Sequence, residues 1–258
     1  MISKITNGYS SLNYYKPLSS GKKINSAKDN ASGLAIANKL HSQEKGLNVG
    51  AESSKQGSNM LNVTDGALNG IGDSLQRIYE LSVKASNGLY SSDDKNAFQK
   101  EIDGLLDNIK NVSTNTEFNT MKILDGSIAT MELATNPSGN GIKIQMQNAT
   151  LESLGIDGYD VTTKDFDISR ITNALDKVNE SRSKLGASTN ALESTYNSNK
   201  INEENTISSR SQLEDLDYMS SFSNFKKSQV LDSFKLMLQS QQQNDEQKIT
   251  QQLFSPSI

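Results

Sequence analysis

The triplet Gly21-Lys22-Lys23 comes nearest in this sequence to a phosphate-binding loop, because it stands just before an apolar, helix-forming segment. A P-loop requires the spacing G-x-x-x-x-G-K-[ST], in which backbone amides surround phosphate and a hydroxyl group contacts magnesium. Lys16 occupies the position of the first glycine, and Lys23 occupies the position of the hydroxyl group. No apolar β-type run precedes the loop. The stretch is therefore interpreted as a linker that leads into a helix.

Side chains for other chemistry are scarce. The chain contains one histidine, His41, and no cysteine, which excludes disulfides, thiol chemistry, zinc sites with several histidines and histidine-based triads. The 30 Asp and Glu residues are scattered along helical segments at spacings typical of solvated faces, and no predicted pocket gathers them. We therefore predict no catalytic, metal or cofactor site and no enzymatic activity.

Charge and hydropathy narrow the class of protein further. The net charge of −4, with both signs interspersed, gives no basic field to attract nucleic acid. No apolar run reaches the ~18 residues of a membrane-spanning helix, and the N-terminal stretch lacks the apolar core of a cleaved signal peptide. The hydrophobic fraction of 34% is low for a large compact core, so a thin, elongated bundle is expected.

A seven-residue repeat runs without proline from Asn30 to about Ser86, which predicts a long helix packed in coiled-coil fashion over about 85 Å. Asn30, or Ser26 just before it, is expected to cap its start. The repeat consists of leucines on one heptad position, serines that fill its gaps and isoleucines three residues further on: Leu40, Leu47, Ser54, Leu61, Leu68, Leu75, Ser82, Ile71 and Ile78.

Glycines interrupt this long helix in pairs spaced by four residues, at Gly46 and Gly50 and again at Gly66 and Gly70. Each glycine costs an isolated helix about 1 kcal/mol relative to alanine. Packing must therefore hold the helix, and we expect neighbouring segments to approach these glycines closely on more than one side.

The remaining segments alternate in type. A second helix is predicted from about residue 93 to 113, alternating apolar and polar residues predict a β-hairpin region at 117–162, and a returning helix is predicted at about 167–197. A seam along the returning helix repeats at seven residues: Ile171, Val178, Leu185 and Leu192. The predicted fold is mainly α, an elongated rod of long coiled-coil-like helices in an out-and-back bundle with a small β-hairpin region.

Several stretches in both halves of the chain together carry a family signature. They are "LSSG" (18–21), "INSAKD" (24–29), "GLAIAN" (33–38), "TDGALNGIGDSLQRIYELSVKASNG" (64–88), "TEFNTMKILDG" (116–126), "LESLGID" (151–157), "KVNESRSKLGASTNALE" (177–193) and "SQLEDLDYMSSFSNFKKSQVL" (211–231). With these motifs the sequence resembles the bacterial flagellins, and the match covers most of the chain in order.

The resemblance implies a division of the chain. Residues 1–18 and 205–258 would form the inner-core terminal helices, and residues 19–204 would form an outer-tube domain of long helices plus the hairpin region. The chain resembles a minimal flagellin without the inserted surface domains. The segment before Leu18 is shorter than the N-terminal inner helix of the family, and Pro17 is expected to end any helix there.

The resemblance also implies a function: a structural subunit of the flagellar filament that assembles itself into a helical tube for motility. It would lie outside the cell in the flagellum, after export without a cleaved signal peptide. The implied partners are copies of itself, the export apparatus, an export chaperone bound to the C-terminal helix, junction and cap proteins, and a host Toll-like receptor. The alternatives are a hook–filament junction protein and a secreted relative that binds the receptor without polymerising.

Three sets of site residues follow from the resemblance. The spoke linker comprises Ser19, Ser20, Gly21, Asn25 and Asp29. The polymerising inner-core stripe comprises Leu213, Leu216, Phe222, Phe225, Val230, Leu231, Phe234 and Leu238. An exposed receptor-contact patch comprises Gln76, Arg77, Glu80, Leu81 and Glu101. The polar residues of the patch also suit an ordinary solvated face, on which Arg77 and Glu80 would pair with each other.

Overall fold

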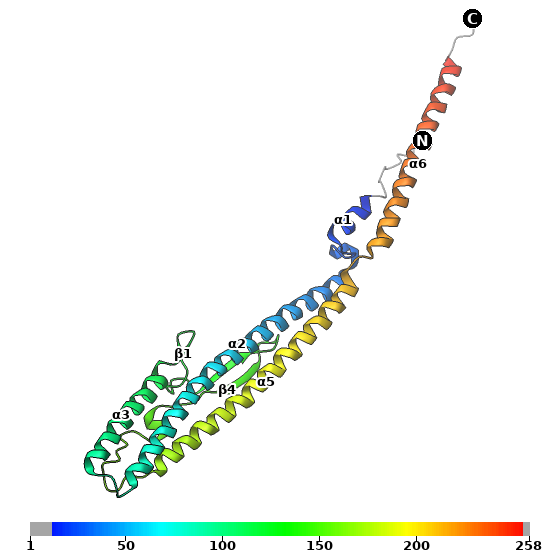
Figure 1. Cartoon of the computed structure of the whole chain (residues 1–258). Coiled ribbons are helices and arrows are strands. Elements are labelled where there is room, and N and C mark those ends of the chain that lie inside the picture. Colours follow the sequence, from blue (N-terminus) through cyan, green and yellow to red (C-terminus); the bar gives the residue numbers. More distant parts are fainter. Residues whose placement is uncertain (1–11, 255–258) are drawn as a thin grey trace. The chain divides into compact units, whose positions relative to one another are not determined.

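The computed structural model describes residues 12–254 and is mainly helical, with long helices and two small antiparallel strand pairs (Figure 1). The predicted fold class is confirmed in these features. The chain divides into two compact units, one containing residues 43–204 and the other the segments before and after them. The parts of the predicted inner core at residues 1–11 and 255–258 lie outside the described residues.

Three helices run through the larger unit: α2 (Ala27–Ser86), α3 (Ser92–Asn115) and α5 (Ser169–Glu214). Helix α5 continues past residue 197, where the predicted returning helix paused, up to Glu214. Figure 1 shows α2 and α5 side by side, and Arg182 of α5 donates to Asp65 of α2 over 2.8 Å. The predicted seams of both helices are buried in one core: Leu61, Leu68, Ile71, Leu75 and Ile78 with Ile171, Val178, Leu185 and Leu192.

Two strand pairs and a short helix pack on these long helices. Strands β1 (Glu117–Phe118) and β2 (Met121–Lys122) form one pair. Strands β3 (Thr130–Ala134) and β4 (Gly141–Gln145) form the other, in antiparallel register from Thr130↔Gln145 to Ala134↔Gly141. Helix α4 (Leu151–Leu154) follows, and the buried Tyr159 beyond it donates its hydroxyl hydrogen to Ser82 Oγ of α2 over 2.9 Å.

The glycines of α2 explain how the β3–β4 hairpin approaches the helix. A Cβ added to Gly50 would lie 2.3 Å from the carbonyl oxygen of Thr135, and one added to Gly46 would lie 2.7 Å from Pro137 Cβ. The close approach expected at this pair is therefore present. It is absent at Gly66 and Gly70, where no described atom lies within 4 Å of an added Cβ. The expectation that neighbouring segments approach Gly66 and Gly70 closely was therefore wrong for the structure of one chain.

The smaller unit contains α1 (Leu12–Ser20) and α6 (Tyr218–Phe254), which pack through the edge-to-face rings of Tyr15 and Phe225, 5.0 Å apart. Pro17 lies inside α1, so the prediction that it ends any helix there was wrong. A proline removes one helical hydrogen bond, which a helix held by a tertiary contact tolerates. The helix ends instead at Gly21, whose φ is +69° and whose amide donates to the Pro17 carbonyl over 2.9 Å.

Alanine substitutions at two glycines of α2 test this account of the packing. In Gly50→Ala the new methyl group meets hairpin backbone, so we expect the free energy of unfolding of the monomer to fall by about 1–3 kcal/mol. In the matched variant Gly66→Ala the methyl group enters open space, and helix propensity should raise the same free energy by about 1 kcal/mol. Urea unfolding followed by circular dichroism measures both. Equal losses in the two variants would contradict the close approach at Gly50.

Candidate functional site

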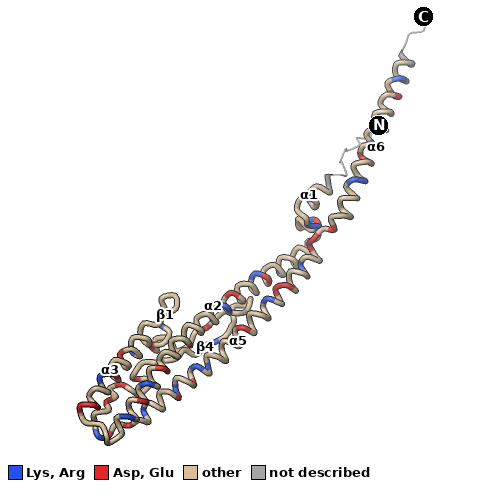
Figure 2. Tube along the Cα trace, viewed as in Figure 1, with Lys and Arg blue, Asp and Glu red and all other residues tan. Residues whose placement is uncertain are grey.

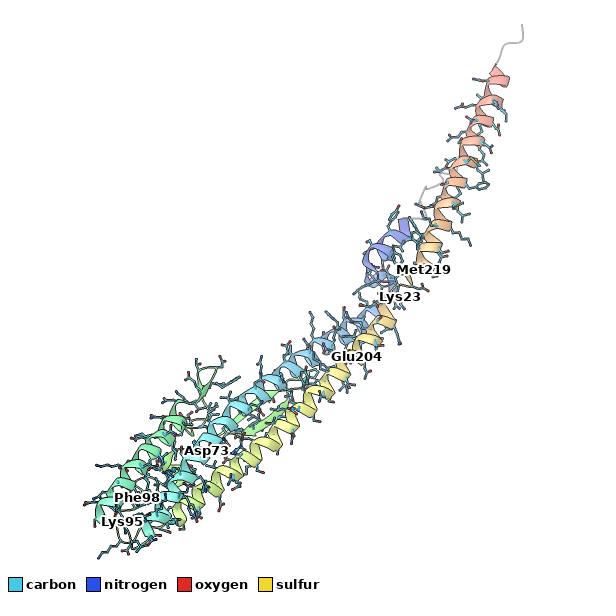
Figure 3. The ribbon with its side chains drawn as sticks, in the orientation of Figure 1. Lys23, Asp73, Lys95, Phe98, Glu204 and Met219 are labelled. Carbon is cyan, nitrogen blue, oxygen red and sulfur yellow. The ribbon has the colours of Figure 1, made fainter. Side chains whose placement is uncertain are left out.

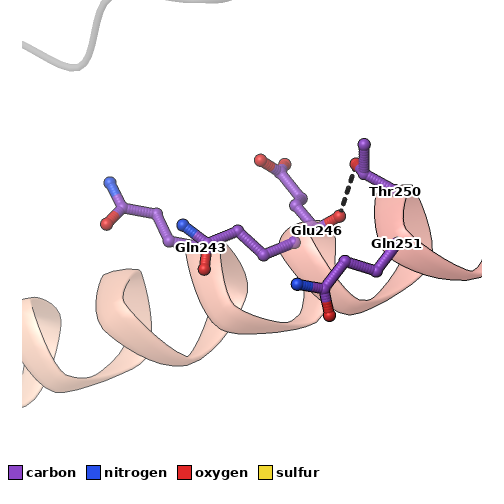
Figure 4. Close-up of a pocket in the computed structure, with 5 residues that line it drawn as sticks. Gln243, Glu246, Thr250 and Gln251 are labelled. Carbon is purple, nitrogen blue, oxygen red and sulfur yellow. Dashed lines mark hydrogen bonds between the residues drawn. The ribbon is translucent and has the colours of Figure 1, made fainter. Parts of the chain in front are cut away.

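No arrangement of catalytic groups is found along the described part of the chain. A hollow of about 510 Å³ on α6 is lined by five exposed residues of that one helix: Gln243, Glu246, Gln247, Thr250 and Gln251 (Figure 4). They offer amides, one carboxylate and a hydroxyl group that already donates to the Glu246 carbonyl over 2.7 Å, so no acid–base pair faces a substrate there. Between residues 12 and 254, no three acidic or histidine side chains are grouped to hold a metal, and no helix is long and apolar enough to cross a bilayer.

The spoke linker is a turn organised by one carboxylate. Asp29 Oδ2 accepts hydrogen bonds from the Ser26 hydroxyl over 2.9 Å and from the amides of Asn25 and Ser26 over 3.0 and 2.9 Å. The Ser26 hydroxyl, followed by the Asn25 amide, lowers the pKa of Asp29 below its ordinary value of 3.8. Asn25 also donates its side-chain amide to the Lys22 carbonyl over 2.7 Å. The linker is thus held by hydrogen bonds to the ionised Asp29.

The long helix proper starts at Asn30, one of the two caps expected from the sequence. Asn30 interrupts α2 with extended backbone angles, φ −164° and ψ 97°, and its Oδ1 accepts from the Gly33 amide over 2.8 Å. This is N-cap geometry, in which a side-chain oxygen satisfies a free amide of the first helical turn. The turn of residues 27–29 therefore belongs to the linker rather than to the long helix.

The linker pairs with the last residue of α5 and with the segment that follows it, a contact that the sequence analysis missed. Lys22 Nζ lies 2.7 Å from Oε2 of Glu214, whose side chain is 8% exposed. The Lys23 amide donates to the Glu214 carbonyl over 2.7 Å, and the Leu216 amide donates to the Gly21 carbonyl over 2.9 Å. No local pattern could reveal a pairing between segments so far apart in sequence. Ser19 and Ser20 lie in the last turn of α1 rather than in the linker.

The C-terminal helix carries a large exposed apolar face. Of the predicted stripe, Phe225 is buried against α1 and Leu213 and Leu216 are half-buried, whereas five residues are exposed: Phe222, Val230, Leu231, Phe234 and Leu238. Met219, which Figure 3 labels, is 81% exposed, and Met237 is 55% exposed. We call Met219, Val230, Phe234, Met237 and Leu238 the outer α6 face, because they lie on the side of α6 opposite Phe225 by helical periodicity.

The two methionines of the outer α6 face were not among the predicted stripe residues. The spacing held the signal, because Met237 lies three residues after Phe234 and seven after Val230, which places all three on one side of a helix. A group of exposed apolar side chains on one side of a helix is typical of an interaction site.

The predicted receptor-contact patch is only partly exposed. Arg77 of α2 joins Glu101 of α3 over 2.7 Å and Glu80 over 3.1 Å, and Gln76 beside it is exposed. Leu81 is 1% exposed and belongs to the core, so its place in an exposed patch was wrong. Leu81 stands three residues after Ile78 of the seam, where a side chain points toward the packed side of the helix.

Charges on the helices of the larger unit are mixed rather than segregated. Figure 2 shows Lys and Arg interspersed with Asp and Glu along α2, α3 and α5. Exposed ion pairs of this type contribute about 0–1 kcal/mol each. These ion pairs therefore add little to the stability of the unit.

Comparison with known proteins decides the family. Residues 2–129 match the model of the bacterial flagellin N-terminal helical region, and residues 168–253 match that of the C-terminal helical region. The chain belongs to the bacterial flagellin family. A flagellin from Halalkalibacterium halodurans is 31% identical over 92% of this chain and 89% of its own length. A flagellin from Xenorhabdus nematophila is 40% identical over 57% of this chain, which spans 48% of that protein.

Flagellins are structural proteins of the flagellar filament outside the cell, so the chain is a filament subunit. Its length is close to that of the Halalkalibacterium relative, as expected of a flagellin that lacks surface domains. A solved structure of a putative flagellar hook-associated protein from Vibrio parahaemolyticus has a TM-score of 0.50 over 73% of this chain and 97% of its own, at 10% identity. At that identity the likeness concerns the helical fold alone.

Acidification tests the role of Asp29 in the linker. Because the pKa of Asp29 is lowered in the folded chain, its stabilising effect is present above the unfolded value of 3.8 and is lost as pH falls through the lower folded value. We expect the Ser26 amide resonance to titrate below pH 3.8 in an NMR pH series. Asp29→Asn, the matched control, should show no such step. A midpoint at or above 3.8 in the unmodified protein would overturn this account.

Proposed function

We propose that this flagellin polymerises through α6, whose outer face is covered by α6 and α1 segments of neighbouring copies in the filament. The observation that carries the proposal is the outer α6 face itself, which leaves Val230 68% and Phe234 53% exposed. Within the described residues, α1 contacts α6 on the Phe225 side. Burial of such side chains against a second copy would supply the main driving force for assembly.

Magnitudes support α6 rather than the larger unit as the source of that driving force. Full burial of one Val, Leu, Phe or Met side chain contributes about 1.5–3 kcal/mol, so burial of the exposed parts of the five residues of the outer α6 face would contribute on the order of 5–10 kcal/mol per copy. The exposed surface of the larger unit offers scattered apolar side chains such as Val49, Val63 and Leu89, together with mixed charges and surface ion pairs, which contribute about 0–1 kcal/mol each. Adhesion therefore comes from α6, and the polar faces restrict how copies fit.

We also propose that the outer α6 face is covered before the chain is exported. Exposed in the cytoplasm, it would cause premature association, so an export chaperone would cover α6 until the chain enters the flagellar export channel. Export would proceed without a cleaved signal peptide, and junction and cap proteins would contact the ends of the growing filament. The length and exposure of the α6 outer face support a chaperone that binds a helix in an apolar groove.

An acidic substitution on the outer α6 face tests the assembly surface. We expect Val230→Asp to raise the critical concentration for filament formation more than tenfold, because a carboxylate would be buried where an apolar side chain packs. Sedimentation and negative-stain electron microscopy in ammonium sulfate measure it. Gln243→Asp places the same charge on an exposed α6 position on the Phe225 side of the helix, opposite this face, and its critical concentration should stay within about twofold of the unmodified protein.

Either of two results would contradict the proposal. If the unmodified chain stays monomeric at all salt concentrations, it does not polymerise by itself. If Val230→Asp and Gln243→Asp assemble equally well, the outer α6 face is not the assembly surface. Circular dichroism of each variant shows whether its helices are intact, so that a lost assembly surface is distinguished from a lost fold.

We also propose that a host Toll-like receptor binds the exposed part of the predicted patch, comprising Gln76, Arg77, Glu80 and Glu101. The ion pairs from Arg77 to Glu101 and Glu80 support this proposal, because they hold polar groups of α2 and α3 together before binding. Leu81 would act from the core, by holding α2 against α3, rather than by touching the receptor.

Substitution of Arg77 tests the receptor proposal. We expect Arg77→Ala to weaken binding of the monomer to the purified receptor ectodomain at least tenfold, because it removes a charged contact and frees two carboxylates. The matched control is Arg182→Ala, which breaks the similarly exposed pair with Asp65 on another part of the unit. Surface plasmon resonance measures both. Equal affinities for the two variants would refute the patch.

A further inference from the structure

The turn between α2 and α3 holds an apolar side chain outward. Leu89 is 88% exposed, the highest value among the exposed large apolar residues of the described chain. Its amide donates to Asn87 Oδ1 over 3.1 Å, and the ring of the next residue, Tyr90, packs edge-to-face on Phe98 at 5.1 Å. Figure 3 labels Phe98 at this end of α3. The turn is thus fixed on both sides of Leu89, which is presented to solvent by an ordered backbone.

A capping box fixes the other side of the same turn. Ser91 accepts from the Asp94 amide over 3.2 Å, and Asp94 Oδ2 accepts from the Ser91 amide over 2.9 Å. An exposed leucine is ordinary on a loose loop. In a turn tied down by these contacts, it has the properties of a preorganised contact residue, because little conformational entropy remains to be lost on binding.

A crevice of matching size lies elsewhere on the same unit, between α2 and α5. It has a volume of about 210 Å³ and is lined by Ser54, Lys55, Ser58, Leu192, Glu193 and Tyr196, with Asn197 at its rim. Small serines at the seam leave this space beside the buried Leu192. A cavity of about 150 Å³ in another protein holds a benzene molecule, so this crevice has room for a branched aliphatic side chain.

Charged side chains of both signs border the turn and the crevice. Lys55 and Glu193 border the crevice, and Asp93 and Lys95 follow Leu89 in the first turn of α3. None of the four takes part in an ion pair that the described structure shows. Opposite charges at both contact surfaces would orient a leucine that enters the crevice and oppose its entry in reverse.

The occupant of the crevice cannot be the Leu89 of the same chain. Ser58 and the end of α2 at Ser86 lie on one continuous helix, and a rise of 1.5 Å per residue separates them by roughly 42 Å. We infer that Leu89 of one copy fills the crevice between α2 and α5 of the next copy along the filament. The inference rests on the proposed function, because it requires filaments.

This contact is heterologous, since two different surfaces of the same molecule meet, and a heterologous contact that does not close generates an open filament. The contact also sets the axial distance between successive copies. If each copy places its turn in the crevice of the next, successive copies are displaced along α2 by the separation of turn and crevice, roughly 45–50 Å. The outer α6 face provides adhesion, and the Leu89 contact provides the axial register.

Disulfide trapping tests the contact directly, because the chain contains no cysteine of its own. Single variants Leu89→Cys and Asn197→Cys are mixed, assembled in ammonium sulfate and oxidised with copper phenanthroline. A disulfide requires the two Cβ atoms to come within roughly 3.5–4.5 Å. The expected result is a covalent dimer in the mixture and no dimer in either variant alone. The double variant should give a ladder of longer oligomers.

The matched control replaces Asn197→Cys by Asn190→Cys, an exposed asparagine seven residues earlier on the same side of α5. It lies about 10 Å from position 197, too far for the same cysteine to reach. A dimer yield with Asn190→Cys at least tenfold lower than with Asn197→Cys supports the contact. Equal yields with both, or dimers of Leu89→Cys alone, overturn it in favour of random collision or a turn-to-turn contact.

A second variant keeps the test independent of cysteine chemistry. Leu89→Ser should raise the critical concentration for filament formation about tenfold or more. Leu89→Met, which keeps a large apolar side chain, should leave it close to that of the unmodified protein. Normal filament formation by Leu89→Ser, together with no trapped dimer in the mixture of the two cysteine variants, would overturn the Leu89 contact and leave the proposed function intact. Failure of the unmodified chain to form any filament would overturn both.

Discussion

The buried seam between α2 and α5 is the interaction on which the rest of the larger unit depends. With only 34% hydrophobic residues, the chain cannot build a wide core, and it places its leucines and isoleucines along one line instead. Helix α2 contains several glycines, each of which costs about 1 kcal/mol relative to alanine. The helix persists because the seam, the hairpin and α3 pack against it, and propensity alone would not maintain it.

The seam also decides where the surface features of the unit fall. Because α2 and α5 are held in register, the small serines at positions 54 and 58 open a crevice beside Leu192 rather than a void within the core. Because Gly50 and Gly57 carry no side chain, the Thr135 carbonyl oxygen just after β3 and the Leu133 side chain of β3 come close to α2. A binding surface and a packing surface thus arise from the same choice of small residues along one helix.

Periodic features of the sequence were predictable, because helix geometry alone determines them. The heptad leucines gave the seam, and the Ser91–Asp94 spacing is the signature of a capping box. Leu81 could have been recognised as buried, since it flanks the seam beside Ile78. Pro17 within α1 could not be foreseen, because the contact between Tyr15 and Phe225 offsets the hydrogen bond that proline removes. The pairing of Lys22 with Glu214 depends on the fold as a whole.

The composition of α6 connects stability with assembly. Between residues 239 and 251 its second half is polar apart from Ile249, and its residues are exposed apart from the half-buried Gln239. A helical stretch that is polar on nearly all sides has little reason to remain folded as an isolated segment. Its first half is apolar on a side that α1 does not cover. Under the proposed function, both halves gain from neighbouring copies, the first by burial and the second by side-chain hydrogen bonds among its glutamines. The contacts between copies would then both order the helix and hold the copies together. Growth at a filament end would therefore be coupled to folding of the arriving subunit.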